Sequence, residues 1–264
     1  MGRDNAASSR MDTLAKALQG AQHSPPPALR PLVRALVVGA GGALGSAVLA
    51  EALVAGRFQR VSAVVTGPLA SAMRGLHPVP AQRLRGPDAL GVDTAFVVFE
   101  RDRHSNGRDD TFLQPDPATL VALARDLHAA GVRRLLVVVP HAAALLPQAL
   151  AHGFASHDEA AVAALGFEHL VFVRAAVGSG APVQGPWLQR FAAWWLSQLR
   201  WMVPQRQQPV RAVRLAQLVV QLARRLPDAP AGTRVVPAEL MWDASQAAAP
   251  ELVLDAWLQQ TRHP

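Results

Sequence analysis

The chain has 264 residues, half of them hydrophobic, and a formal net charge of +7, which allows two average domains or one large α/β unit with a full core. It contains no cysteine, so disulfides and thiolate metal sites are excluded, and a reducing compartment is a consistent expectation. The basic residues include a single lysine, Lys16, and the arginines are scattered, so the charge does not indicate nucleic-acid binding.

Residues 1–30 are predicted to form a disordered, proline-rich tail. Residues 1–30 lack the apolar core of a secretory signal, and the stretch HSPPPALRP is too rich in proline for a helix. The uncharged run Ala35–Ala50 is shorter than the roughly 20 apolar residues of a membrane-spanning helix, and its glycines suit a different role. We therefore expect no membrane span and a cytoplasmic location.

Predicted strands and helices alternate in the next part of the chain, starting with the strand RALVVGA and a helix over Leu44–Ala55. Further strands are expected at RVSAVVTG, DTAFVVFE, VRRLLVVVP and HLVFVRA, with a weaker one near 79–85. Further helices are expected over Pro117–Ala130 and at HDEAAVAALG, which ends at Gly166. Strands that are apolar throughout and alternate with helices indicate a parallel sheet covered on both faces.

The pattern changes after Gly180. We assign residues 31–180 to a doubly wound parallel sheet. We assign residues 181–264 to a small C-terminal cap on the same unit, folded over the carboxyl ends of the strands. The elements expected there are an aromatic-rich helix over Trp187–Trp201, a helix over Val213–Leu226, a short strand at TRVVPA and a helix over Pro250–Gln260.

A glycine cluster lies between the first strand and the first helix. Gly39, Gly42 and Gly45 form G-x-x-G-x-x-G, and Gly41 adds a fourth glycine. In such a unit the first glycine permits a tight turn, the second lets a pyrophosphate approach the backbone, and the third lets the helix pack on the strand. The helix N-terminus adds unpaired N–H groups and a positive dipole. These glycines, with Ala43 and Leu44, are predicted to bind a dinucleotide; the alternative is a turn that binds nothing.

This glycine spacing resembles that of the extended and atypical short-chain dehydrogenase/reductases, and within them the nitrogen-metabolite-repressor-like and Tat-interacting oxidoreductase-like branch. Three stretches in the same order support the resemblance: PDPATLVALARDLHAAGVRRLLVVV, FEHLVFVRAAVGSG and PVRAVRLAQLVVQLAR. Ala175 stands where the family has proline, and Arg214 where it usually has aspartate. The resemblance spans roughly residues 34–240 and implies a Rossmann fold that binds NAD(P), with Phe99 and Val139 among the cofactor-binding residues.

The end of the second predicted strand bears on the choice between NAD and NADP. NAD-preferring proteins place an acid there to accept from the ribose hydroxyls, whereas this chain reads TGP from Thr66. Because this carboxylate is missing, the site permits a 2′-phosphate. The candidate to neutralise that phosphate is Arg74, and Arg57 and Arg60 are weaker candidates. Each of these arginines is equally consistent with a solvated surface charge. We expect Thr66 and Arg74 in the cofactor site and NADP in preference to NAD.

The catalytic residues of the resembled family are missing. Its enzymes generally use Tyr-x-x-x-Lys with a nearby Ser or Thr, but this chain has no tyrosine and its one lysine lies in the tail. The positions of that pair fall near Ala151 and Ala155, and the serine position falls near Val139 and Pro140. Loss of a general acid commonly costs about 10²–10⁴-fold in rate, so no residue is assigned a standard catalytic role.

His141 is the candidate for a substitute proton donor, because it follows the strand that normally carries the serine and can donate a proton near neutral pH. A loop or surface histidine is the plainer interpretation. His152 and His157 have no further ligand nearby, so no metal site is expected. Asp158 and Glu159 are interpreted as acids favoured at a helix N-terminus, and VGSGAP lacks the nucleophile elbow of hydrolases.

Two further segments are candidates for contacts with a ligand or a partner. Glu100 and Arg101 follow the strand DTAFVVFE near the expected nicotinamide end, although ERDRHSNGRDD reads mainly as a solvated loop. The Trp187–Trp201 helix is apolar nearly all round, which fits packing inside the protein, a lid over a pocket, or a surface for a protein partner.

Three functions remain open on these observations. The leading hypothesis is an NAD(P)-binding regulator or scaffold that resembles atypical short-chain dehydrogenases but lacks Tyr-x-x-x-Lys. The second is an NADP-dependent oxidoreductase with a non-standard proton donor, and the third is an interaction protein whose glycine loop binds no nucleotide. Resemblance at the level of fold does not decide between them.

Overall fold

The computed structural model describes residues 33–69, 74–85, 91–100, 111–141, 157–176 and 210–260. Several expectations from the sequence fall outside these ranges. They concern the N-terminal tail, Arg101, Ala151, His152, Ala155 and the Trp187–Trp201 helix.

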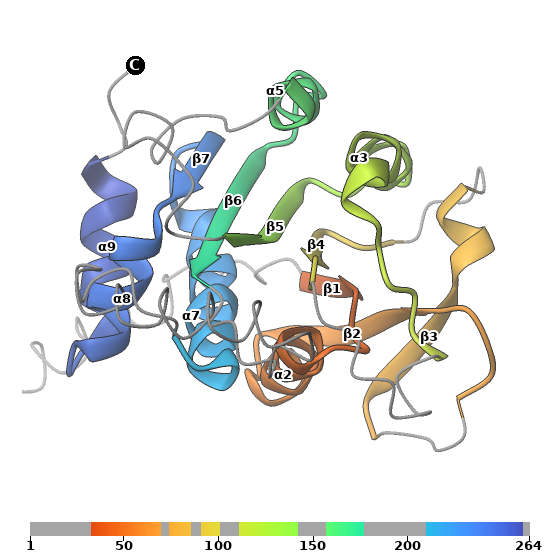
Figure 1. Cartoon of the computed structure of the whole chain (residues 1–264), viewed down its shortest axis with the longest axis horizontal. Helices are drawn as coiled ribbons and strands as arrows, with labels where there is room; N and C mark the ends of the chain where they lie inside the picture. Colours follow the sequence, from red (N-terminus) through yellow and green to blue (C-terminus); the bar gives the residue numbers. More distant parts are fainter. Residues whose placement is uncertain are drawn as a thin grey trace, which may run out of the picture. The chain divides into compact units, whose positions relative to one another are not determined.

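The described chain folds around one parallel sheet of seven strands in the order β3-β2-β1-β4-β5-β6-β7 (Figure 1). The strands are β1 (Val33–Val38), β2 (Phe58–Val65), β3 (Leu76–Pro80), β4 (Thr94–Val98), β5 (Arg134–His141), β6 (His169–Ala176) and β7 (Gly232–Val236). The strand order reverses at β1, because β2 and β3 lie on one side of it and β4 on the other. This is the doubly wound Rossmann arrangement, which binds ligands in the crevice at the carboxyl ends of the two strands that flank the reversal. The expected fold class is confirmed.

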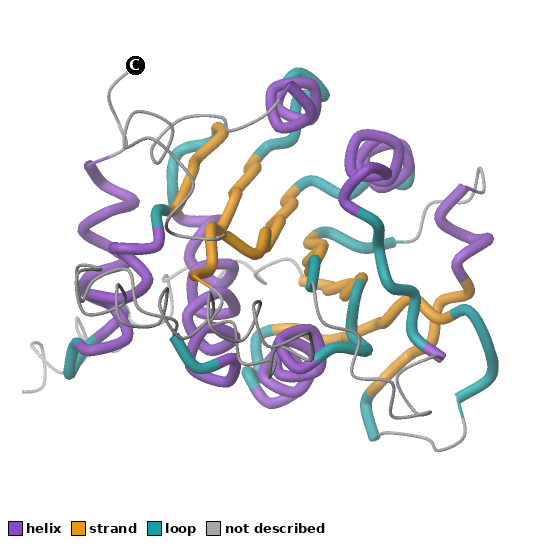
Figure 2. The backbone as a smooth tube through the Cα atoms, viewed as in Figure 1, coloured by secondary structure: helices purple, strands orange, loops and turns teal. Residues whose placement is uncertain are grey.

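Helices cover both faces of the sheet. In Figure 1 and Figure 2, α2 (Ala43–Val54) and α7 (Ala212–Arg225) lie on one face, and α3 (Leu120–Ala129) and α5 (His157–Ala163) lie on the other. Side chains of each strand alternate between the two cores. On β4, for example, Phe96 packs with α2 and α7, whereas Val97 packs with α3 and α5. Because both faces are buried, the central strands are apolar throughout.

The weak strand candidate near 79–85 lies earlier than the sequence suggested. The strand β3 ends at Pro80, and Ala81–Arg85 forms the 3-10 helix η1. β3 pairs with β2 alone, at the edge of the sheet. An edge strand tolerates Pro78 and Pro80, because their missing N–H groups are not needed by a second neighbour. The two prolines therefore make β3 difficult to predict from the sequence, although they do not prevent the strand from forming.

Residues 210–260 complete the sheet and do not form a layer over its carboxyl edge. β7 pairs with β6, and α7 packs beside α2. Two further helices, α8 (Ala238–Gln246) and α9 (Pro250–Gln260), pack against α7 and against each other; α8 was not expected. These elements therefore belong to the same compact unit as the rest of the sheet.

A buried ion pair joins α5 to β6. The carboxylate Oε2 of Glu159 lies 3.1 Å from Nη2 of Arg174, and the two residues are 5% and 3% exposed. Asp158 and Glu159 both lie in the first turn of α5, as expected of acids favoured at a helix N-terminus. Glu159 differs from the exposed Asp158 in being buried, and a carboxylate buried to this degree requires a close cation.

A row of buried polar side chains crosses the amino ends of three adjacent strands. Thr94, Arg134 and His169 are partners in register on β4, β5 and β6, and all three are buried. Glu168 Oε1 lies 3.5 Å from Nε2 of His169. Burial lowers the pKa of His169 below 6.5, and this effect outweighs the attraction of Glu168, which raises the pKa. His169 is therefore a buried neutral histidine near pH 7.

Candidate functional site

Two glycines of the β1–α2 loop are required by the packing of the backbone. Gly39 has φ of +90°, and a β-carbon there would overlap the carbonyl oxygen of Val98 at the end of β4. A β-carbon at Gly45, in the first turn of α2, would overlap the carbonyl oxygen of Gly39. The close approach of β1, β4 and α2 explains both glycines, whether or not the loop binds a ligand.

Gly42 is different, because its backbone is one that any residue adopts. It is the N-cap of α2, with φ −87° and ψ 176°. The atoms nearest to a β-carbon at this position would be those of the Glu100 carboxylate. Gly42 therefore supplies space beside the helix N-terminus, and the group that fills this space is negatively charged.

The Glu100 carboxylate binds the N-terminus of α2. Its Oε1 accepts a hydrogen bond of 2.7 Å from the N–H of Leu44, and its Oε2 accepts one of 3.3 Å from the N–H of Gly45. The sequence around Glu100 is mainly that of a solvated loop, whereas in the structure its side chain is partly buried and hydrogen-bonded. It lies where a dinucleotide-binding loop holds the pyrophosphate.

Gln114 accepts from the two preceding N–H groups of the loop. In the amide orientation that satisfies its neighbours, its side-chain oxygen lies 3.2 Å from the nitrogen of Gly42 and 3.3 Å from that of Gly41. Four N–H groups of the loop are thus bonded to Glu100 and Gln114. Sequence reasoning did not connect either side chain with the glycines. For Glu100 a signal existed, a carboxylate directly after a strand; for Gln114 there was none.

Residues Thr111–Asp116, which we call the strap, cross the carboxyl ends of β1 and β2. Leu113 of the strap donates its N–H to the carbonyl of Val64 at 3.0 Å and accepts from the N–H of Gly39 at 3.0 Å. The N–H of Thr66 donates to the first residue of the strap at 2.8 Å. The strap therefore covers part of the crevice in which doubly wound proteins bind their ligands.

The other predicted cofactor residues lie along the same edge with different exposure. Thr66 is exposed and lines a cavity of about 280 Å³ between the ends of β2 and β3. Phe99 is only 2% exposed and its ring lies in the core beside α3, so the ring does not face this edge. Val139 is partly buried in the same core. His141 is the last residue of β5 and pairs with Ala176 of β6, which places its backbone at the carboxyl edge.

Arg74, the arginine favoured for a 2′-phosphate, is not brought to Thr66. It precedes β3, whose first residue Leu76 pairs with Val61 of β2. Arg74 therefore lies at the amino edge of the sheet, and Thr66 follows β2 at the carboxyl edge. At roughly 3.3 Å per residue the two are separated by about 20 Å along the strands, which exceeds the reach of an arginine. Arg60 lies in the first half of β2, also away from the carboxyl edge.

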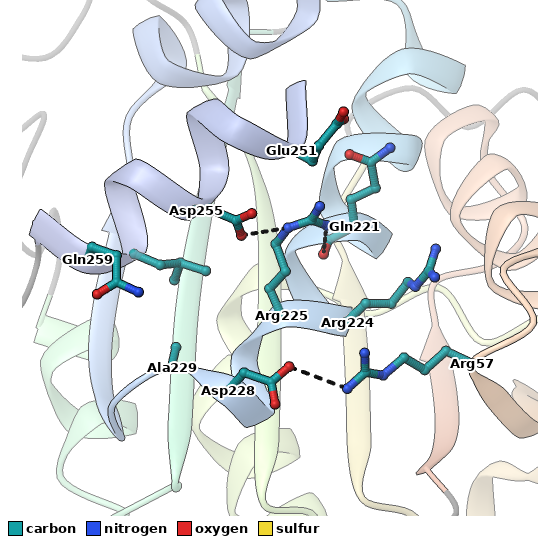
Figure 3. Close-up of a pocket in the computed structure, with 10 residues that line it drawn as sticks. Arg57, Gln221, Arg224, Arg225, Asp228, Ala229, Glu251, Asp255 and Gln259 are labelled. Atoms are coloured by element: carbon teal, nitrogen blue, oxygen red, sulfur yellow. Dashed lines mark hydrogen bonds and ion pairs between the residues drawn. The ribbon is translucent and has the colours of Figure 1, made fainter. Parts of the chain in front are cut away.

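Arg57 lines a cavity of about 410 Å³ at the amino side of the sheet (Figure 3). Its Nη2 lies 3.6 Å from Oδ2 of Asp228, and in the same cavity Nε of Arg225 lies 2.7 Å from Oδ1 of Asp255. The charges in this cavity largely pair with each other. It is separated by the length of the sheet from the glycine loop, so it belongs to a different place from the predicted cofactor site.

The described residues contain neither a membrane-spanning helix nor a cluster of metal ligands. No helix among them has both the length and the hydropathy needed to cross a bilayer. Nor do they bring three histidine, aspartate or glutamate side chains close enough to hold a metal ion.

Comparison with known proteins identifies a shared fold. No known family model matches the sequence, and no curated protein is similar to it at a significant level. The oxidoreductase ylbE from Lactococcus lactis aligns with a TM-score of 0.50 at 12% identity, over 88% of this chain and 100% of that one. The Bordetella bronchiseptica enzyme WbmH, solved in complex with NAD+, gives 0.47 at 15% identity, over 81% and 80%. UDP-N-acetylglucosamine 4-epimerase from Bacillus cereus gives 0.44 at 12%, over 88% and 100%.

The strand order and the likeness to the Lactococcus lactis oxidoreductase define the class of protein. The chain is a Rossmann-type α/β protein. At these identities the likeness concerns the fold, and function has to be argued from the site.

Proposed function

We propose that the chain binds a nicotinamide dinucleotide at the carboxyl edge of its sheet, with the pyrophosphate at the N-terminus of α2. The observation that supports this most is that four N–H groups of the loop donate to acceptor oxygens at one place. Two of these N–H groups donate to the Glu100 carboxylate, and the other two donate to the Gln114 amide oxygen. An anion at this place gains from the N–H groups and from the helix dipole. The cavity beside Thr66 suits the adenosine half, and the end of β5 suits the nicotinamide half.

We propose that the bound nucleotide serves as a signal or a structural group, in a protein related to the atypical short-chain dehydrogenase/reductases. The chain has no tyrosine, and its one lysine is Lys16. Without the tyrosine–lysine pair, proton delivery to a substrate loses about 10²–10⁴-fold in rate. The role is then that of a regulator or scaffold, with the aromatic-rich segment Trp187–Trp201, which lies outside the described residues, as the candidate surface for a protein partner. His141 remains the candidate donor of the enzyme alternative.

The preference for NADP over NAD rests on one feature. No carboxylate follows β2, where Thr66 stands, so nothing in the described part of that turn repels a 2′-phosphate. Arg74 does not add to the argument, because it lies at the other edge of the sheet. We therefore expect both nucleotides to bind, with NADP favoured modestly.

One observation favours a second candidate, an interaction protein that binds no nucleotide. The loop N–H groups already have partners within the chain, and the strap covers the ends of β1 and β2. A loop whose donors are satisfied in this way needs no ligand in order to fold. The glycines at 39 and 45 are equally consistent with this candidate, because packing alone requires them.

Titration with NADPH and NADH, followed by energy transfer from tryptophan to nicotinamide, tests the proposal. In Gly42→Asp the new carboxylate displaces that of Glu100 and takes the phosphate position, while aspartate remains a good N-cap residue in this backbone conformation. Ser46→Asp is the matched control, since it adds the same charge at an exposed position of the first turn of α2.

Binding that Gly42→Asp abolishes and Ser46→Asp retains supports nucleotide binding at this loop. Absence of binding at millimolar nucleotide, in the wild type and also in Glu100→Ala, overturns it and leaves the interaction protein. Turnover of a carbonyl or quinone acceptor that His141→Ala abolishes would instead support the oxidoreductase.

A further inference from the structure

Glu100 and a pyrophosphate cannot occupy the glycine loop together. Both are anions, and both use the N–H groups of Leu44 and Gly45. The space left by the missing side chain of Gly42 is filled by the Glu100 carboxylate. If the loop is a phosphate site, its anion position is therefore already taken by a residue of the same chain.

We propose that Glu100 is a built-in competitor of the nucleotide, so that the site is autoinhibited until the Glu100 side chain swings away from α2. This inference rests on the proposed function and names how the same site is regulated. Glu100 is anchored by the end of β4, the strand beside β1 at the reversal of strand order. A rotation of its side chain empties the anion position without any change in the sheet.

The proposed role of Gln114 differs from that of Glu100, because an amide side chain carries both a hydrogen-bond acceptor and a donor. With its oxygen toward the loop, Gln114 accepts from Gly41 and Gly42 and helps to close the site. With the amide turned over, its NH₂ group donates to a phosphate oxygen at the same place. An ionised Glu100 has no donor to offer. Entry of a phosphate therefore expels Glu100 and converts Gln114 from a competitor into a ligand.

The cost of opening sets the size of the expected effect. The Glu100 carboxylate makes two charge-assisted hydrogen bonds, which are stronger than neutral ones. A ligand that binds only the open form loses apparent affinity in proportion to the fraction of molecules that are open. With the net strength typical of hydrogen bonds to charged groups, removing Glu100 should raise nucleotide affinity about ten- to hundredfold.

The experiment compares the full chain with Glu100→Gln and Glu100→Ala. Glu51→Gln is the matched control, because it removes the same charge from α2 two turns beyond the loop. Each protein is titrated with NADPH, NADH and inorganic pyrophosphate, and circular dichroism and thermal melting check the fold. We expect affinity for all three probes to rise in the order wild type, Glu100→Gln, Glu100→Ala, with Glu51→Gln like the wild type. Gln114→Ala in the Glu100→Ala background should then weaken binding.

The outcomes separate this inference from the proposed function. Equal nucleotide affinity in the wild type and both Glu100 variants overturns the inference and leaves nucleotide binding intact. Tighter pyrophosphate binding in the variants without any nucleotide binding supports Glu100 as the occupant of an anion site and overturns the dinucleotide. No binding of any probe by any protein overturns both. If Glu100→Ala does not fold, Glu100→Gln carries the test, because it retains one acceptor for the helix N-terminus.

Discussion

The carbonyl oxygen of Val98 and the α-carbon of Gly39 approach each other so closely that no side chain fits between them. Val98 ends β4 and Gly39 follows β1, and these two strands are neighbours at the reversal of strand order. The contact fixes where the chain leaves the sheet to begin α2. The fold therefore requires glycine at position 39 whether or not the loop binds a ligand.

Replacing Gly39 should cost more stability than replacing a glycine with the same backbone conformation and free space. Gly131 also has φ of +90°, but a β-carbon there meets nothing within 4 Å. We expect Gly131→Ala to lose about 1–2 kcal/mol from backbone strain, and Gly39→Ala to lose at least about 3 kcal/mol because overlap is added to the strain. Urea unfolding measures both, and equal losses would contradict the role given to Val98.

The buried pair of Glu159 and Arg174 should behave as a unit. Glu159→Ala leaves the guanidinium of Arg174 buried without its carboxylate, and we expect a loss of about 3–5 kcal/mol in the free energy of unfolding. The double replacement Glu159→Leu with Arg174→Met removes both charges and should recover most of that loss. A double variant that is less stable than Glu159→Ala would show that the pair itself contributes net stability.

His169 should make the protein less stable as the solution becomes more acidic. Its folded-state pKa lies below 6.5, chiefly because of burial, so the unfolded chain takes up a proton at this residue at higher pH than the folded chain does. The free energy of unfolding therefore falls as the pH decreases from 6.5 to the folded-state pKa. Urea unfolding at about pH 7.5 and about pH 5.5 should show a smaller decline in His169→Gln than in the wild type. Equal declines in the two proteins would contradict this.

The choice of nucleotide should respond to Thr66 and not to Arg74. Thr66→Asp places a carboxylate after β2, where it repels a 2′-phosphate and accepts from ribose hydroxyls. We expect NADPH to bind about tenfold or more weakly, while NADH is affected less. Arg74→Gln, at the opposite edge of the sheet, should leave the ratio of the two affinities unchanged. A ratio that follows Arg74 instead would show that the nucleotide lies elsewhere.

Most of the strands and helices could be predicted from the sequence, because burial on both faces of a sheet leaves a local record. The strands around Leu36, Phe96 and Val137 are apolar throughout, as a covered parallel sheet requires. The exceptions have local causes. Pro78 and Pro80 weaken the strand pattern of β3. The short helix α8 begins directly after β7, with Pro237 as its N-cap, so the sequence pattern does not separate the helix from the strand.

The sequence by itself determined the fold class, the position of the glycine loop and the absence of the tyrosine–lysine pair, because each depends on residue type or on spacing along the chain. Only the tertiary structure decided what fills that loop. Glu100 and Leu44 are 56 positions apart, and the strand order at β1 and β4 brings them together. The parallel pairing of β3 with β2 places Arg74 at the opposite edge of the sheet from Thr66, although the two are close in sequence. Periodicity reports which side chains are buried, whereas partners across a sheet depend on how strands are ordered and registered, and no local pattern carries that information.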